Sequence, residues 1–383
     1  MTDRAPIWSE LVGQDEAVNQ VELAVRHRDQ GVFHSWLITG PPGSGRSNLA
    51  EAFAAALECP EGGCGTCKSC TLARVGTHPD IRVLSTEKVQ ISIAELRELV
   101  NSAAYGASMG RFRILIIEDA DRMSATASNV LLKSLEEPPA NTIWILCAPS
   151  EADMLPTIRS RVRRVGLKVP AVADVAKLLI DRDGIEPKLA LQVAAEAQSH
   201  IGMARRLATS SEARARRRET LASALGIMNV TDAIKASDLW LDLAKKDAAA
   251  LTKERDEEER ATLMHTMGLG PSDPIPPALR SEFKNLEDAQ KRRATRSIRD
   301  GLDRIFVDLL ALYRDVLTVQ LGGGVDLVNE DLQREIGVLA AKTTPTSTIT
   351  KLEKIEQARE RIDRNVRDHM VLDALASALR REQ

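Results

Sequence analysis

The loop Gly40–Ser47, with the sequence Gly-Pro-Pro-Gly-Ser-Gly-Arg-Ser, constrains this chain more than any other feature. It matches the phosphate-binding pattern G-x-x-x-x-G-K-[ST] except that Arg46 stands in the lysine position. In such a loop the backbone N–H groups surround phosphate oxygens, the lysine reaches the outer phosphates and the hydroxyl holds Mg²⁺. A guanidinium is bulkier than an ammonium and donates as a fork, so the exchange is not conservative. The loop is therefore predicted to bind ATP or ADP and Mg²⁺ weakly, without turnover. The residues assigned to this binding are Gly40, Gly43, Ser44, Gly45, Arg46 and Ser47.

The segments on either side of the loop predict the strand–loop–helix order that a phosphate-binding loop requires. Residues 36–39 are apolar and β-prone, and residues 48–57 are rich in helix formers. Two more apolar runs, 112–117 and 142–148, read as buried strands, and the helix between them must stop at Pro138-Pro139. Strands that alternate with helices indicate an α/β fold with a parallel sheet covered on both faces.

Glu118 and Asp119 follow the second of these strands directly. In phosphate-loop ATPases a carboxylate at such a strand tip holds the Mg²⁺ shell and a second one polarises the attacking water. Carboxylates also occur there as loop or helix-cap residues, so both interpretations remain open.

Four of the five cysteines lie close together, with the spacing C-x4-C-x2-C-x2-C. They are Cys59, Cys64, Cys67 and Cys70. Disulfides are disfavoured in a reducing cytosol, and four thiolates suit a tetrahedral Zn²⁺ ion with no open coordination position. A structural zinc site is predicted, and the alternative is a loop of free thiols.

Composition limits the function and location that we expect. The chain has 383 residues and a formal net charge of -3, so the whole molecule presents no strong field to nucleic acid. The first residues lack the apolar core of a signal peptide, and no apolar run reaches the length of a membrane span. We expect a cytoplasmic protein without membrane contact.

The remainder of the chain reads as helical. Residues 167–210 are predicted to form a small helical domain and residues 211–383 a larger one. The basic run Arg214–Arg218 is interpreted as a solvated face, and the proline-rich stretch 268–277 as a break within the larger domain. Two helices are expected after Gly322-Gly323-Gly324.

The order of motifs resembles that of bacterial DNA polymerase III clamp-loader subunits of the AAA+ superfamily, in particular the delta-prime family. The resemblance is dense over about the first 170 residues and weaker afterwards. Besides the phosphate loop and the cysteines, it is carried by Leu11–Gln14, His34–Leu37, Thr77–Asp80, Leu131–Pro138 and Leu155–Arg161.

This resemblance implies three domains and a role within a complex. They would be an AAA+ domain over 1–166 with a zinc insert at 59–70, a helical lid over 167–210 and a collar over 211–383 that packs in a hetero-oligomeric ring. The partners implied are gamma/tau-type motor subunits, a delta-type subunit, the sliding clamp and, through the complex, primed DNA. The pair Ser160-Arg161 is expected to act in trans, with Arg161 as an arginine finger at the ATP site of a neighbouring motor subunit.

Several positions depart from the hydrolysing members of the family. Glu118-Asp119 stands where those members carry Asp-Glu, and Pro149-Ser150 where they carry two threonines. Depending on the alignment, either Arg205 or Ala204 occupies the position of the family's second sensor arginine. Together with Arg46, these departures predict a degenerate ATP site and at most a weak ATPase.

Two other functions remain open from the sequence. The chain could be an ATP-hydrolysing gamma/tau-type motor subunit, or a zinc-containing DNA-binding protein that uses the phosphate-loop fold as a scaffold. Close to Arg161 in the sequence, Arg159, Arg163 and Arg164 form a basic cluster that either contacts DNA phosphate or is simply solvated.

Overall fold

A computed structural model of the chain describes residues 4–86, 90–267, 269–270 and 273–380. The chain divides into two compact units, Met1–Ala208 and Thr209–Gln383. The division into domains over 1–166, 167–210 and 211–383 remains a prediction.

The first unit is built on a parallel sheet of five strands. They are β1 (Ser35–Thr39), β2 (Ile81–Leu84), β3 (Arg113–Ile117), β4 (Thr142–Ala148) and β5 (Arg163–Gly166). Their order across the sheet is β2-β3-β4-β1-β5, and every neighbouring pair is parallel. The carboxyl ends of all five strands therefore meet at one edge, where open α/β sheets bind ligands. The predicted fold class, an α/β unit followed by a helical region, is confirmed.

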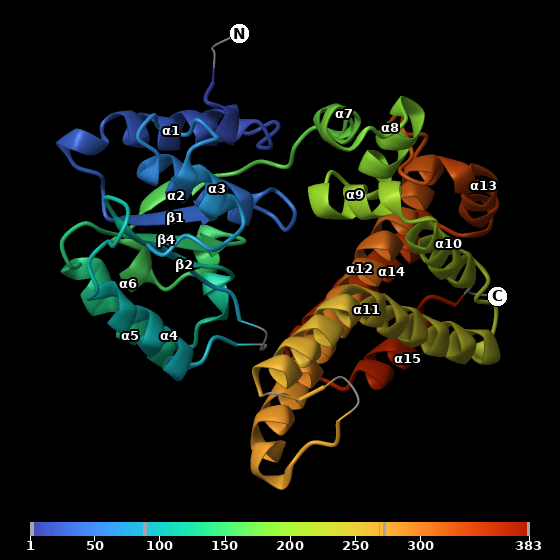
Figure 1. Ribbon diagram of the computed structural model, residues 1–383. Helices are drawn as coiled ribbons and strands as arrows, with labels where there is room; N and C mark the ends of the chain where they lie inside the picture. Colours follow the sequence, from blue (N-terminus) through green and yellow to red (C-terminus); the bar gives the residue numbers. More distant parts are fainter. Residues whose placement is uncertain (1–3, 87–89, 268, 271–272, 381–383) are drawn as a thin grey trace. The chain divides into compact units, whose positions relative to one another are not determined.

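Helices cover both faces of this sheet (Figure 1). One face packs against α1 (Asp15–Arg26) and α2 (Arg46–Glu58), and the other against α4 (Ile93–Ala103) and α5 (Ala125–Glu136). Side chains alternate between the faces, so Trp36 and Ile38 of β1 join the α1/α2 core while Leu37 joins the α4/α5 core. Burial on both faces explains the continuous apolar runs in the central strands.

Shorter elements complete the first unit. Among them are α3 (Lys68–Arg74), which follows the cysteine-rich turn, and α6 (Pro156–Arg159), which precedes β5. Three more helices, α7 (Val172–Asp183), α8 (Pro187–Glu196) and α9 (Ile201–Thr209), form the region that the sequence predicts as a small helical domain. The remaining short turns are the 3-10 helices Pro6–Trp8, Arg28–Gln30, Ala120–Arg122 and Glu151–Asp153.

The second unit is helical throughout its described residues. It begins with α10 (Ser211–Leu225) and the two long helices α11 (Val230–Thr266) and α12 (Arg280–Gln320). The 3-10 helix Pro277–Leu279 precedes α12, and the 3-10 helix Glu330–Leu332 precedes α13 (Gln333–Lys342). Its apolar core joins all six helices through residues such as Leu221, Trp240, Leu309, Ile355 and Leu372. The predicted break at 268–277 falls between α11 and α12, and residues 268, 271 and 272 lie outside the described part.

Two expectations for this unit were wrong. Three helices, not two, follow the glycine triplet: α13 (Gln333–Lys342), α14 (Pro345–Asp363) and α15 (Asp368–Ala378). The run Arg214–Arg218 is not wholly a solvated face, because the side chain of Arg217 is buried and paired with Asp308 at 3.0 Å. Among the described residues, no helix is both long enough and apolar enough to cross a membrane.

Candidate functional site

The phosphate-binding loop leads from the end of β1 into the first turn of α2, which confirms the predicted strand–loop–helix order. Gly43 and Gly45 have φ values of +80° and +93°, a backbone conformation that side chains disfavour, and Gly45 is the N-cap of α2. The loop begins beside β4, where the Gly40 N–H donates to the Pro149 carbonyl oxygen at 3.2 Å. The backbone therefore has the glycine-dependent turn and helix N-terminus that an anion site uses.

The Arg46 side chain is turned back onto its own loop. Its Nη1 donates to the Gly40 carbonyl oxygen at 2.5 Å, and its Nη2 lies 3.8 Å from Asp119 Oδ1. Only 14% of the side chain is exposed. Its charge is therefore already balanced within the chain, where a lysine would be expected to extend toward bound phosphate.

A second side chain covers the loop from His200, the residue directly before α9. A methyl group placed on Gly43 would lie 2.2 Å from Cγ of His200, so the imidazole rests directly on the glycine. The Ser44 side chain beneath is 2% exposed, and its hydroxyl has no hydrogen-bond partner within the described structure. The loop in this conformation is closed by Arg46 and His200 together.

The acidic pair after β3 faces the same loop, although its two members differ. Asp119 has a left-handed backbone (φ +48°) and approaches two arginines, Arg46 and Arg122. Glu118 lies near Glu51 of α2 and Cys147 of β4. The pKa of each of these two groups is raised mainly by burial and, second, by the negative charge of Glu118. The structure thus brings Glu118 and Asp119 to the loop as the sequence predicts, but Asp119 is engaged by Arg46. Their function as Mg²⁺ ligands stays a prediction.

The other positions at which the chain departs from the hydrolysing members of the family are Pro149-Ser150 and Ala204-Arg205. Ala204 of α9 is fully buried, and Arg205 beside it pairs with Asp183 at 3.2 Å. Pro149 and Ser150 follow β4, and the Ser150 hydroxyl accepts a hydrogen bond from the Ala152 N–H.

Ser160 and Arg161 lie at the end of α6, and the contacts described for Arg161 are with α5, α6 and Ser160. Its Nε donates to Glu136 Oε1 at 2.7 Å, and its Nη1 donates to the Thr157 carbonyl oxygen at 2.7 Å and to Ser160 Oγ at 2.9 Å. The Arg161 side chain is 35% exposed. Within the described residues the pair is thus placed outside the chain's own phosphate loop, as the arginine-finger prediction requires.

The four clustered cysteines converge on one point. Their sulfur atoms all lie within 4.8 Å of one another, and the Cys59–Cys64 and Cys59–Cys67 sulfur distances are 3.6 and 3.7 Å. Four thiolates bound tetrahedrally to zinc at ~2.3 Å would lie about 3.8 Å apart, so the spacing fits that ion. Backbone N–H groups of Thr66 and Cys67 lower the pKa of the Cys64 thiol to about 6, whereas burial raises the pKa of the Cys67 and Cys70 thiols. The cluster could therefore hold a metal ion, and zinc is the ion that its donor set suits best.

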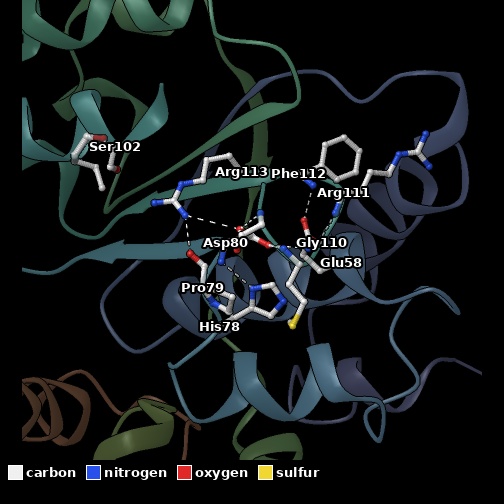
Figure 2. Close-up of polar contacts among 12 residues, drawn as sticks. Glu58, His78, Pro79, Asp80, Ser102, Gly110, Arg111, Phe112 and Arg113 are labelled. Carbon is white, nitrogen blue, oxygen red and sulfur yellow. Dashed lines mark hydrogen bonds and ion pairs between the residues drawn. The ribbon is translucent and has the colours of Figure 1, made fainter. Parts of the chain in front are cut away.

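Two buried carboxylates, Asp80 and Glu58, hold the segment that leads into β3 (Figure 2). Asp80 accepts hydrogen bonds from the backbone N–H groups of Ser108, Met109 and Gly110 at 2.6 to 2.8 Å. Glu58 accepts from those of Arg111 and Phe112, each at 2.8 Å. Consecutive N–H groups over 108–112 are thereby satisfied, which fixes the start of the strand that carries Glu118 and Asp119.

Sequence reasoning pointed to the loop, the acidic pair, the cysteines and the Ser-Arg pair, and their functions stay predictions. It missed His200, Asp80 and the contact of Glu136 with Arg161. Asp80 and Glu136 lie in two of the motifs that carry the family resemblance, which is the signal that could have drawn attention to them.

The chain is similar to known subunits of DNA polymerase III. A family model described as "DNA polymerase III, delta subunit" matches residues 13–171. The DNA polymerase III subunit delta' of Pseudomonas aeruginosa is 38% identical over 165 residues, which cover 42% of this chain and 50% of that protein. The DNA polymerase III subunit delta' of Bacillus subtilis is 25% identical over 379 residues, covering 95% of this chain and 97% of that protein.

Matches to another subunit type cover less of the relative. The DNA polymerase III subunit gamma/tau of Mycobacterium tuberculosis is 29% identical over 278 residues, 65% of this chain and 44% of that protein. The chain thus spans about half the length of the Pseudomonas relative and less than half of the Mycobacterium one. A solved structure of a Thermotoga maritima gamma subunit-related protein has a TM-score of 0.44 and 19% identity, over 95% of this chain and all of that chain.

Proposed function

Since the chain belongs to the delta' family of DNA polymerase III subunits, we propose that it is a non-hydrolysing clamp-loader subunit that serves a neighbour's ATP site. Its homologues are named as subunits of DNA polymerase III, which supports a function in replication by that enzyme. The proposal adds how this chain takes part.

The observation that carries the proposal is the conformation of Arg46. Its guanidinium is held by the Gly40 carbonyl oxygen and lies near Asp119, so the cation and one of the carboxylates of the site neutralise each other. Binding ATP with Mg²⁺ would require both groups to separate and His200 to leave Gly43. Each of these rearrangements opposes nucleotide binding, which supports a degenerate site in which ATP or ADP binds weakly and turnover is absent.

Arg161 is assigned the trans-acting role. It follows the short helix α6, its described contacts are with α5, α6 and Ser160, and its side chain is about one-third exposed. Its guanidinium carries a permanent charge. An arginine supplied by a neighbouring subunit stabilises charge on the transferring phosphoryl group and contributes about 10³ to 10⁵ in rate in related enzymes. Ser160 supports it through the hydrogen bond from Arg161 Nη1 to the Ser160 hydroxyl.

The remaining parts of the proposal concern partners and the metal. The second unit, Thr209–Gln383, would act as a collar that assembles with gamma/tau-type motor subunits and a delta-type subunit in a hetero-oligomeric ring. That ring would open the sliding clamp and load it onto primed DNA in the cytoplasm. Cys59, Cys64, Cys67 and Cys70 would hold a structural Zn²⁺ ion that ties the end of α2 to α3.

The test is a complex reconstituted with the wild-type chain or with Arg161→Ala. We expect the two complexes to assemble equally, as judged by size, because Arg161 is a surface residue. The variant should lower DNA- and clamp-stimulated ATP hydrolysis and slow clamp loading. Equal hydrolysis and loading rates in the two complexes would show that Arg161 does not act in trans.

A second candidate is an ATP-hydrolysing motor subunit. It rests on the gamma/tau match, which covers 65% of this chain, whereas the Bacillus delta' match covers 95% of it. Robust ATPase activity of the isolated chain that is lost in Arg46→Ala would support this alternative and contradict a degenerate site.

A further inference from the structure

The Arg161 guanidinium is fixed by a carboxylate on another helix. Glu136 Oε1 lies 2.7 Å from Nε and 2.5 Å from Nη2, so a single oxygen faces the side edge of the guanidinium. On the other side, Nη1 contacts the Thr157 carbonyl oxygen and the Ser160 hydroxyl. The Ser160 hydroxyl in turn donates to the same Thr157 oxygen at 3.1 Å. Acceptors from α5 and α6 thus determine the plane of the guanidinium.

Glu136 occupies a position that helix stability alone does not favour. It is the last residue of α5, where the partial negative charge of the helix terminus disfavours an acid. The double proline after Glu137 ends the helix there, so the backbone that carries this carboxylate has little freedom. The contact with Arg161 compensates for the unfavourable location of the charge.

We infer that Glu136 is a positioning residue for Arg161, which it holds ready for the phosphates of a nucleotide on the neighbouring subunit. This inference rests on the proposed function. A free arginine side chain has rotamer entropy, part of which is lost when it engages phosphate. Glu136 removes that freedom beforehand and leaves the guanidinium partly open to solvent, with 35% of the Arg161 side chain exposed.

The experiment uses the reconstituted complex with Glu136→Gln, Arg161→Ala, and both substitutions together. Glutamine keeps the size of the side chain and one acceptor oxygen but removes the charge. We expect Glu136→Gln to lower the kcat of stimulated ATP hydrolysis about threefold to tenfold while the KM for ATP and complex assembly stay unchanged. In the Arg161→Ala background the same substitution should have no further effect, because its influence passes through Arg161. The matched control is Glu137→Gln, which removes the same charge one residue away and should leave kcat unchanged.

The outcomes separate this inference from the function on which it rests. If Arg161→Ala has no effect, the trans-acting role fails and the positioning role falls with it. If Arg161→Ala lowers kcat but Glu136→Gln matches the wild type or exceeds it, only the positioning role is overturned. An equal loss from Glu136→Gln with and without Arg161 would also overturn it, since the effect would then be independent of the arginine.

Discussion

At the scale of single residues, the buried carboxylate of Asp80 is stabilised by the backbone N–H groups that it binds. Asp80 has no exposed surface, and its carboxylate accepts three backbone N–H groups from the turn before β3. Gly110 in that turn tolerates no side chain, because a methyl group there would lie 1.5 Å from Glu58 Oε2. The Thr77–Asp80 motif is therefore structural: it secures the strand that carries the acidic pair.

Asp80→Asn is predicted to destabilise the protein by about 2 to 3 kcal/mol at pH 7, because an amide nitrogen cannot accept from the N–H groups that would face it. Burial alone would raise the pKa of Asp80, but the N–H groups of Ser108, Gly110 and Met109 together lower it to about 2. A depressed pKa contributes stability above the unfolded pKa of about 3.9, and this contribution is lost as the pH falls toward 2. Chemical denaturation of both proteins between pH 7 and pH 2.5 measures it.

Other charged and titratable groups, which are present in both the wild type and the variant, lie close to Asp80. Arg113 lies 4.0 Å from it, while nearby Glu58 has its pKa raised mainly by burial and thus acts in the opposite sense with pH. Burial also lowers the pKa of His78, whose Nδ1 accepts from the Asp80 N–H. The wild-type advantage over Asp80→Asn should shrink only below about pH 4. A constant advantage down to pH 2.5 would contradict the lowered pKa.

At the scale of elements, the central strands could be predicted from the sequence and the edge strands could not. β1, β3 and β4 are buried on both faces and appear as apolar runs. β2 (Ile-Arg-Val-Leu) and β5 (Arg-Arg-Val-Gly) form the two edges of the sheet and carry exposed or arginine side chains, so they give no such run. Contacts between distant segments, such as His200 with Gly43 or Glu136 with Arg161, follow from tertiary packing, which no local pattern encodes.

The turn between α2 and α3 should depend on its metal. We expect the purified chain to contain about one zinc ion, and Cys67→Ser to lose it, because three remaining thiolates bind more weakly than a closed tetrahedral set. Cys67 is also the N-cap of α3, where its sulfur accepts from the Cys70 N–H, so the variant should lower the melting temperature as well. Metal analysis and thermal unfolding measure the two effects. Cys147→Ser, which changes a buried cysteine of β4 outside the cluster, should keep its zinc. Freshly purified wild-type chain without zinc would refute the site.

The second unit has its own buried polar network, which connects α10 to α12. Arg217 donates to Asp308 at 3.0 Å and to Asn329 at 2.6 Å, and Asn329 donates to Asp315 at 2.8 Å. Burial raises the pKa of Asp308, and the positive charges of Arg217 and Arg304 oppose that shift.

Arg217→Ala is therefore predicted to destabilise the protein by about 3 kcal/mol or more, because it leaves a buried carboxylate and an amide without their partner. Arg218→Ala, on the adjacent exposed residue, should change the free energy of unfolding by less than about 0.5 kcal/mol. Urea denaturation of the two variants tests the assignment. Similar small losses in both would mean that Arg217 behaves as a solvated arginine.

At the scale of the whole molecule, charge argues against independent DNA binding. Lys and Arg number 52 against 55 Asp and Glu, and the basic cluster before and within β5 is occupied inside the chain. Arg159 and Arg164 lie 3.4 and 2.5 Å from Glu151, and the Arg163 guanidinium lies 5.1 Å from the ring of Trp36. Affinity for DNA depends on cations that can neutralise phosphates and release counterions, and these three arginines are already engaged.

The isolated chain of 383 residues is therefore expected to bind primed DNA no more tightly than about 10 µM at physiological salt, within the range of non-specific binding. Glu151→Gln should strengthen that binding and steepen its dependence on salt by about one to two counterions, since it removes the carboxylate shared by two arginines. Asp153→Asn removes an equal charge from an exposed residue near Glu151, and it should steepen the salt dependence of DNA binding less. Fluorescence anisotropy over a salt series measures all three proteins. Tight, salt-sensitive binding by the wild-type chain alone would instead favour a DNA-binding zinc protein, because a clamp-loader subunit of the kind proposed reaches DNA through its complex.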